Sequence, residues 1–337
     1  MRQRFKGLSL ALAVAMALSL AACTSREGNT SSSSRSSSSS RASSSRSATS
    51  SVVDDLKDAA SDAKDGIKDT VSDIGDSMKD AASNVESAAR PTMSTDFSQI
   101  GALDTQQVPW GPGVLVDENN RTTEPIWNQE KYGQYSAYFI GPEDCGKFYL
   151  TFDEGYENGF TPKILDVLQE KEVSAVFFVT LPFVQSQPEL VQRMIDEGHV
   201  IGNHTSHHWN PTQKTLEEAA EDIRELHDYM EEEFGYTMTL YRPPEGAFSE
   251  QTLAMAQEMG YTTVLWSFAY KDYDVNDQPT VQDASERTER FIHEGAIYLL
   301  HAVSETNATI LGELIDEVRA RGLEVARWDL PYLPPET

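Results

Sequence analysis

Beyond Gly146 the spacing of apolar residues switches repeatedly between two periodicities. Short runs rich in β-branched and aromatic residues predict seven strands, at 147–152, 174–179, 200–204, 239–242, 262–268, 296–301 and 324–328. Between them, apolar residues recur every three or four positions and predict helices near 161–171, 188–197, 215–234, 249–259, 281–293 and 307–321. Gly198, Gly260 and Gly322 follow three of these helical patterns, at positions where helices commonly end. The alternation predicts an α/β domain of βα units on a parallel sheet or barrel.

The start of the chain has the pattern of an export signal. Basic residues at positions 2, 4 and 6 precede an apolar run over 8–22, which is typical of a signal peptide and short for a membrane span. The run ends in Leu-Ala-Ala-Cys, which matches the bacterial lipoprotein processing box and predicts lipidation of Cys23. Ordinary cleavage after Ala22, with Cys23 unmodified, is the alternative. If Cys23 carries lipid, Cys145 is left without a disulfide partner.

Two stretches of low complexity follow the predicted signal peptide (1–22). Serine accounts for 15 of the 21 residues over 31–51, and we therefore expect a disordered linker over 23–51. Over 52–90 alanine-rich apolar positions recur at steps of three and four and predict an amphipathic helical spacer. Self-association and membrane-surface binding are the alternatives for this spacer, and its Asp-rich polar face argues against anionic lipids.

The charge of the chain excludes one class of function. The 337 residues include 54 acidic and 27 basic side chains, a net charge of −27. Binding to nucleic acid requires a concentrated basic surface, so we expect no nucleic-acid partner. Residues 147–337 contain 35 acidic and 13 basic side chains, so most of the acidity lies in the predicted α/β domain.

Ionisable side chains lie at, or just beyond, the ends of five predicted strands. They are Asp153, Glu154, His204, Arg242, Asp272 and His301. The carboxyl ends of the strands form the catalytic face of an α/β barrel, so we expect these side chains to converge there. The alternative, that each is merely a hydrogen-bonded polar residue at a strand end, fits any one of them better than the whole set.

His204 and His208 form a candidate pair of metal ligands. They are four residues apart, a spacing that places two imidazoles on one face of a helical turn. A carboxylate from Asp153 or Glu154 could complete the ligand set and leave open positions, as in catalytic sites for zinc or a similar divalent ion. A pair of surface histidines is the alternative. His207 is expected to point away from the ion.

The same residues include a candidate base and a candidate acid. Asp153 beside the ion can accept a proton from water, and Arg242 can hold it in place. His301 can donate a proton to a leaving amine, and a buried Asp272 beside it would raise its pKa.

The segment Arg-Pro-Pro-Glu-Gly at 242–246 is a candidate oxyanion site. The negative charge that develops on the carbonyl oxygen during hydrolysis can be met by the ion and by a backbone N–H. Proline has no N–H, so the donor would be Glu245 or Gly246.

Five ordered segments resemble the motifs of the NodB-type polysaccharide deacetylases, carbohydrate esterase family 4. They are Thr-Phe-Asp-Glu-Gly (151–155), His-Thr-Ser-His-His (204–208), Arg-Pro-Pro-Glu-Gly (242–246), the region from Trp266 to Tyr273, and Ile-Tyr-Leu-Leu-His (297–301). Within that family the chain is most similar to the δ-lactam-biosynthetic de-N-acetylases of peptidoglycan, through Gly-Tyr-Glu-Asn-Gly (155–159) and Gly-Ala-Ile-Tyr-Leu-Leu-His (295–301). Pro109-Trp110-Gly111 and residues 135–141 resemble the lead-in segment of that subgroup.

The resemblance implies a distorted (β/α)₇ barrel, NodB-like, over 147–337, with residues 91–146 as a lead-in segment packed on it. It also implies metal-dependent removal of the N-acetyl group from an amino sugar. The roles it assigns are base (Asp153), metal ligands (His204, His208), orientation of the base (Arg242), tuning of the acid (Asp272), acid (His301) and lining of the acetyl pocket (Trp266, Tyr273, Leu299). The chain departs from the family pattern where Glu154 replaces a metal-binding Asp and where Tyr273 replaces a Trp.

The leading hypothesis is a peptidoglycan N-deacetylase, with N-acetylmuramic acid as one candidate substrate, exported and held at the membrane by a lipid anchor facing the cell wall. A chitooligosaccharide or exopolysaccharide deacetylase is an alternative of the same class. A catalytically inactive glycan-binding lipoprotein is the alternative from a different class, motivated by Glu154. The acidic domain disfavours heavily anionic substrates, which favours glycan strands without their peptides.

Overall fold

The computed structural model describes residues 91–335, and its centre is a curled sheet with parallel strand pairing throughout. The strands are β1 (Ala137–Tyr138), β2 (Lys147–Glu154), β3 (Val176–Val179), β4 (Val200–Asn203), β5 (Leu240–Tyr241), β6 (Thr262–Val264), β7 (Ala296–His301) and β8 (Glu324–Val325). Their order is β1-β6-β5-β4-β3-β2-β7, with β8 also paired to β2. Beyond β6, the Ser267 N–H donates to the carbonyl of Ile297 on β7 (2.9 Å), which brings the chain after β6 against β7. The distorted (β/α)₇ barrel predicted from the sequence is confirmed.

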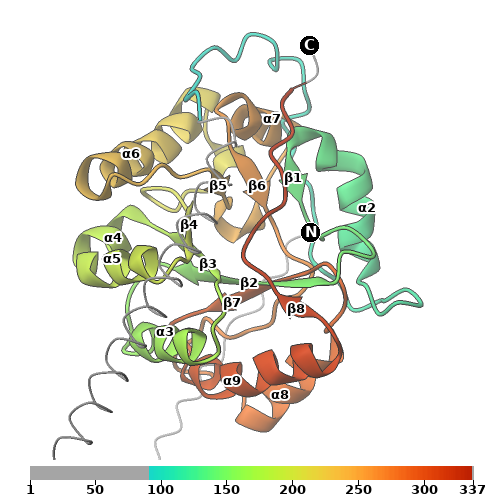
Figure 1. The fold of residues 1–337 in the computed structure, drawn as a ribbon. Coiled ribbons are helices and arrows are strands. Elements are labelled where there is room, and N and C mark those ends of the chain that lie inside the picture. The colour runs from blue at the N-terminus through green and yellow to red at the C-terminus, as the bar shows by residue number, and fades with distance from the viewer. Residues whose placement is uncertain (1–90, 336–337) are drawn as a thin grey trace, which may run out of the picture. The chain divides into compact units, whose positions relative to one another are not determined.

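Helices surround this curled sheet (Figure 1). They are α2 (Thr123–Tyr132), α3 (Thr161–Glu170), α4 (Leu181–Ser186), α5 (Pro188–Asp196), α6 (Leu216–Phe234), α7 (Glu250–Glu258), α8 (Val281–Arg290) and α9 (Glu305–Ala320), with 3₁₀ turns η1 (Gly133–Tyr135), η2 (Pro211–Gln213) and η3 (Pro244–Gly246). The longest, α6, begins at a capping box in which Thr215 and Glu218 satisfy each other's backbone N–H groups. It ends at Gly235, whose φ of 61° is the left-handed conformation favoured by glycine.

Alternate residues of β2 face two different apolar cores. Phe152, like the residues two and four positions before it, packs in the cluster shared with the surrounding helices. Tyr149 packs in the cluster inside the barrel. Because side chains alternate along a strand, Asp153 lies on the inner face with Tyr149, whereas Glu154 lies on the outer face with Phe152.

The segment after β8 closes the barrel at the end opposite the carboxyl ends of the strands. Trp328 packs in the inner cluster against Tyr138 and Tyr149, with ring centroids 5.8 and 5.3 Å apart. The Tyr138 hydroxyl donates to the carbonyl of Pro331 (2.9 Å), and the Leu333 N–H donates to the Ser136 hydroxyl (3.0 Å). Residues distant in sequence therefore cover the inner core at the end of the barrel opposite the active site.

All seven predicted strands are present, with boundaries that differ in an informative way. β2 runs two residues beyond its predicted end, to Glu154, whereas the strand predicted over 262–268 ends at Val264. Among the α-helices and strands, three were not predicted: α2, α4 and β1, which lies in the 91–146 segment and pairs with β6. The predicted signal peptide, Cys23, linker and spacer lie outside the described residues. Within residues 91–335, the helices are too short or too polar to cross a bilayer.

Candidate active site

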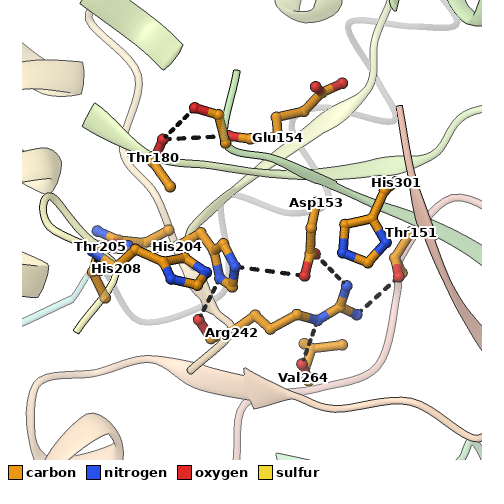
Figure 2. A network of polar contacts seen from close by, with 12 residues as sticks. Thr151, Asp153, Glu154, Thr180, His204, Thr205, His208, Arg242, Val264 and His301 are labelled. Carbon is orange, nitrogen blue, oxygen red and sulfur yellow. Dashed lines mark hydrogen bonds and ion pairs between the residues drawn. The ribbon is translucent and has the colours of Figure 1, made fainter. Parts of the chain in front are cut away.

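Four strands deliver ionisable side chains to one place at their carboxyl ends (Figure 2). Asp153 on β2 and His301 at the end of β7 are register partners on adjacent strands. His204 directly follows β4, and Arg242 directly follows β5. The structure thus brings together the predicted base, acid, orienting arginine and first metal ligand.

Arg242 is fully buried and hydrogen-bonded along the whole guanidinium group. Its Nη1 donates to Asp153 Oδ1 (2.7 Å), its Nη2 to the Thr151 hydroxyl (2.8 Å) and its Nε to the Val264 carbonyl (2.9 Å). Burial alone would raise the pKa of Asp153, but the positive charge and the hydrogen bond of Arg242 outweigh burial and lower that pKa. Asp153 is therefore an ionised carboxylate with a fixed orientation.

His204 and His208 lie next to each other, with ring centroids 4.9 Å apart. The sequence spacing suggested a helical turn, but the segment is a loop in which Thr205 and His208 have φ angles of 69° and 55°. These left-handed residues turn the chain back on itself. The predicted pairing of the two rings is thus present through a different backbone geometry.

The two imidazoles fit the chemistry of a divalent metal site. His204 Nδ1 lies 2.8 Å from the carbonyl of Arg242, which can only accept, so Nδ1 carries the proton and Nε2 keeps a lone pair. That Nε2 is 3.5 Å from Asp153 Oδ2. Burial lowers the pKa of His204 to about 4, so the ring is neutral at neutral pH. A neutral imidazole oriented through its other nitrogen is the form that binds zinc and similar ions.

Glu154 does not join this pair. Its side chain leaves the opposite face of β2, and Figure 2 shows it pointing away from Asp153 and His204. Its carboxylate oxygens lie 3.4 and 3.5 Å from the hydroxyl of Thr161 at the start of α3. Burial, reinforced by the charge of Glu157, raises the pKa of Glu154 well above its usual value. We therefore leave Glu154 out of the proposed ligand set.

His301 is held by a buried carboxylate. Asp272 Oδ1 lies 2.7 Å from His301 Nδ1, and Asp272 Oδ2 accepts the His301 backbone N–H (2.8 Å). Asn307 on α9 donates to the same Oδ2 (2.6 Å) and to the His301 carbonyl (3.1 Å). Burial alone would lower the pKa of His301, but the hydrogen bond and charge of Asp272 outweigh it and raise that pKa. The ring is thus poised to carry a proton, as the sequence predicted.

The turn at η3 presents one free backbone donor. Glu245 is left-handed (φ 60°). The Gly246 N–H is already donated to the Pro243 carbonyl (3.0 Å), whereas the Glu245 N–H has no hydrogen-bond partner among residues 91–335. The Gly246 carbonyl accepts from Trp110 Nε1 (2.7 Å), and a Cβ at Gly246 would lie 2.5 Å from the ring of Trp266. Of the two predicted oxyanion donors, Glu245 is the one that remains available.

The three predicted pocket-lining residues lie around these groups. Leu299 is buried on β7, two positions before His301 and on the same face. The exposed ring of Tyr273 lies edge-on to His301, with centroids 5.6 Å apart. Trp266 lies against Gly246 at η3. Their contact with an acetyl group stays a prediction.

Three residues that support the site have no role among the sequence predictions. A role for Thr151 could have been predicted, because it lies two positions before Asp153 and on the same face of the strand. Trp110 is part of the segment that resembles the family's lead-in, but its bond to η3 spans 136 residues and has no local signal. Asn307 lies in α9, where nothing in the local pattern points to Asp272.

The chain is similar in sequence and in fold to several known proteins. The family model for polysaccharide deacetylase matches residues 141–264. The peptidoglycan-N-acetylmuramic acid deacetylase PdaA of Bacillus subtilis is 43% identical over 226 residues, which cover 67% of this chain and 86% of that protein. The solved structure of Bacillus subtilis PdaA, a family 4 carbohydrate esterase, superposes with a TM-score of 0.63 at 36% identity over 67% of this chain and 96% of that one. A family 4 carbohydrate esterase from Bacillus anthracis gives a TM-score of 0.55 at 36% identity, with the same coverage of both chains.

The likeness to PdaA extends over most of that protein's length. The chain therefore belongs to the polysaccharide deacetylases of carbohydrate esterase family 4, hydrolases that act on amide bonds.

Proposed function

We propose that this protein hydrolyses the N-acetyl group of amino sugars in peptidoglycan, with N-acetylmuramic acid as a candidate substrate. The observation that carries the proposal is the placement of Asp153 and His301 side by side on β2 and β7, next to the His204–His208 pair. The reaction breaks the amide C–N bond, forms a bond between the acetyl carbon and a water oxygen, and releases acetate and a free amine.

Asp153 is the proposed base. It stays ionised because Arg242 donates to one of its oxygens, which leaves Oδ2 directed toward His204 and available for a proton from the attacking water. His204 and His208 would hold a divalent ion, which supplies a Lewis acid for the acetyl carbonyl and lowers the pKa of water. Its identity is left to experiment, because two imidazoles beside a carboxylate suit zinc and several similar ions.

Glu245 and His301 complete the proposed reaction. The free Glu245 N–H would stabilise the oxyanion as the carbonyl carbon becomes tetrahedral. His301, whose pKa is raised by Asp272, would donate a proton to the sugar nitrogen as the C–N bond breaks.

The choice of peptidoglycan is supported by the relative with 43% identity, which is a peptidoglycan-N-acetylmuramic acid deacetylase. The net charge of −22 over residues 147–337, from 35 acidic and 13 basic side chains, disfavours heavily anionic polymers. Glycan strands that have lost their peptides match this surface better than intact, carboxylate-bearing strands.

The proposed place of action is outside the cell, which suits a cell-wall substrate. The basic head and apolar run over 1–22 support export, and Cys23 after Leu-Ala-Ala supports a lipid anchor in the membrane. Metabolic labelling with a fatty acid tests the anchor directly: wild type should incorporate the label, and Cys23→Ala should not. Label in the variant would contradict lipidation at Cys23.

Mass spectrometry of cell-wall fragments, incubated with and without the metal-loaded protein, tests the proposed reaction. We expect loss of one acetyl group from muramic acid residues, with matching release of acetate. Loss from glucosamine alone, or faster acetate release from chitin oligomers than from cell wall, would replace the proposed substrate. Binding to cell wall with no acetate release at any of several divalent ions would favour the inactive glycan-binding alternative.

A further inference from the structure

The loop that carries His208 is strained and depends on its surroundings. Thr205 and His208 are both left-handed, with φ angles of 69° and 55°, and this conformation is unfavourable for non-glycine residues. Two bonds form close to the loop: Thr205 N–H donates to Asn203 Oδ1 (2.9 Å), and His208 N–H donates to the Thr205 hydroxyl (2.9 Å). Contacts from outside the loop must help to fix its path.

Asp222 on α6 supplies those outside contacts. Its carbonyl accepts the Ser206 N–H (3.0 Å). Its Oδ1 accepts the His207 backbone N–H (2.8 Å) and lies 2.7 Å from His207 Nδ1. Asp222 is buried although it is an acidic residue on a surface helix, which is a cost that these hydrogen bonds offset. The backbone carbonyl of Asp222 thus anchors Ser206, and its side chain anchors His207.

His207 extends this anchor to the surface. Its ring stacks on Trp209, with centroids 4.4 Å apart and planes 16° apart, and Lys214 lies over the same indole at 3.7 Å. His207 is therefore held against α6 while its neighbour His208 faces His204.

The two proposed metal ligands are secured very differently. His204 N–H donates to the Val179 carbonyl (2.9 Å), and its ring is fixed by the Arg242 carbonyl. His208 is exposed and its ring has no hydrogen bond to another residue among 91–335, so the position from which the ring reaches out is set by the backbone of the loop.

We propose that Asp222 and His207 are positioning residues that fix the loop so that His208 points at the metal ion. This inference rests on the proposed metal role of His204 and His208. The His207, Asp222 and Glu225 ligand atoms also lie within 4.8 Å of one another, so the three residues could instead hold an ion themselves. Positioning is favoured because Asp222 Oδ1 already accepts two N–H groups of His207, and Glu225 Oε2 is farther from that ring, at 3.7 Å.

Titration of the metal-free full-length protein with Zn²⁺, followed by calorimetry, tests the proposal without any glycan. We expect one ion per chain in the wild type. Asp222→Ala should weaken zinc affinity about 10- to 100-fold, the usual effect of losing a group that orients a ligand. His207→Ala, which keeps the backbone bond to Asp222, should weaken it by a smaller factor. Glu225→Gln is the matched control on the same helix and should leave affinity unchanged.

Zinc affinity within twofold of wild type in folded Asp222→Ala would overturn the proposal, as would a second zinc ion in wild type that Glu225→Gln removes. Circular dichroism and a melting curve verify folding, and His207→Ala carries the test if Asp222→Ala does not fold. Failure of the proposed function has a separate signature: the wild type would bind zinc at one site and release no acetate from cell wall or chitin.

Discussion

The site has two halves that are built in different ways. Asp153 and His301 lie on adjacent strands, so their separation is set by the hydrogen-bond register of β2 and β7. The His204–His208 loop and the turn at Glu245 lie outside regular structure and use left-handed residues. The backbone of the first half is fixed by strand pairing, whereas the backbone of the second depends on contacts from elsewhere, such as those of Asp222 and Trp110.

This difference separates the groups proposed to move protons from the groups proposed to contact the substrate carbonyl. Proton transfer needs a donor and an acceptor at a constant separation, which a pair of bonded strands provides. Metal ligands and an oxyanion donor must converge on one point from several directions, which loops do more easily than strands. Substitutions in the two halves are therefore expected to differ in size and in kind.

The largest effect is expected at Asp153. Asp153→Asn removes the base while keeping the shape, and acetate release from cell wall should fall by about 10²- to 10⁴-fold, the usual contribution of general base catalysis. Glu154→Gln is the matched control on the other face of β2 and should stay within about twofold of wild type, because the group it changes lies outside the proposed chemistry. Similar losses in both variants would mean that strand alternation does not separate the two carboxylates functionally.

Removal of the metal tests the His204–His208 loop in the second half of the site. Chelation should lower activity at least about 100-fold, and adding back a divalent ion should restore it. Because an ion that binds the folded protein stabilises it, chelation of a protein saturated at 100 times its Kd should also lower the Tm by about 5–10 °C. An unchanged Tm and full activity in chelator would exclude a metal role for His204 and His208.

Asp272→Asn tests the proposed acid, His301, in the first half of the site. Asp272 raises the pKa of His301, so the proton is held up to a higher pH than in free histidine and is lost as the pH rises through that pKa. Without the charge of Asp272, the alkaline limb of the kcat profile should move to lower pH, and activity at neutral pH should fall by about 10- to 100-fold. An unmoved alkaline limb in a folded variant would show that another group donates the proton.

Trp110→Phe is a smaller change that tests the turn at Glu245, in the second half of the site. A smaller aromatic ring stays against Phe139 and Trp266, while the hydrogen bond to the Gly246 carbonyl is lost. A slightly misplaced Glu245 N–H should lower kcat by about 10-fold, a fraction of the loss from deleting an oxyanion donor, with little change in KM. The exposed Trp127→Phe serves as control. A change in KM alone would place Trp110 in binding rather than in positioning.

The smallest effect concerns stability and the outer face of β2. The folded state raises the pKa of Glu154, so its contribution is fully present below the unfolded value near 4.5 and is lost as pH rises toward the folded pKa. Glu154→Gln removes that loss and should raise the Tm by at least about 2 °C at pH 8, equivalent to about 1 kcal/mol in a domain of this size. At pH 4 the wild type and Glu154→Gln should have the same Tm. A higher Tm for the variant at pH 4 as well would mean that better packing, and not the lost charge, stabilises it.

The periodicity of the sequence was sufficient to place the strands and, through them, most of the site. Asp153, Arg242 and His301 could be predicted because buried parallel strands are easy to recognise and their carboxyl ends meet. The strand β1 could not be predicted, because two residues carry no alternation and pair only with the distant β6.

The errors within the site arise where local spacing gives no tertiary information. The predicted first strand ends at Phe152, which places Asp153 and Glu154 together beyond its end. In the structure the strand continues through both residues, so their side chains alternate and lie on opposite faces. The four-residue spacing of His204 and His208 suggested a helical turn, but bonds from Asp222 hold a loop with two left-handed residues instead. Asn307 and Trp110 act across the fold, where periodicity has no influence.

The segment after β8, which closes the barrel at the end opposite the active site, has a consequence for how the chain folds. Tyr138 bonds to Pro331 across 193 residues, and Ser136 bonds to Leu333 across 197. The inner aromatic cluster is therefore exposed until the segment after β8 has been synthesised, and loops of that length close slowly. A nascent chain would therefore stay open at this end, and accessible to chaperones, until its last strand and the segment that follows it had been made.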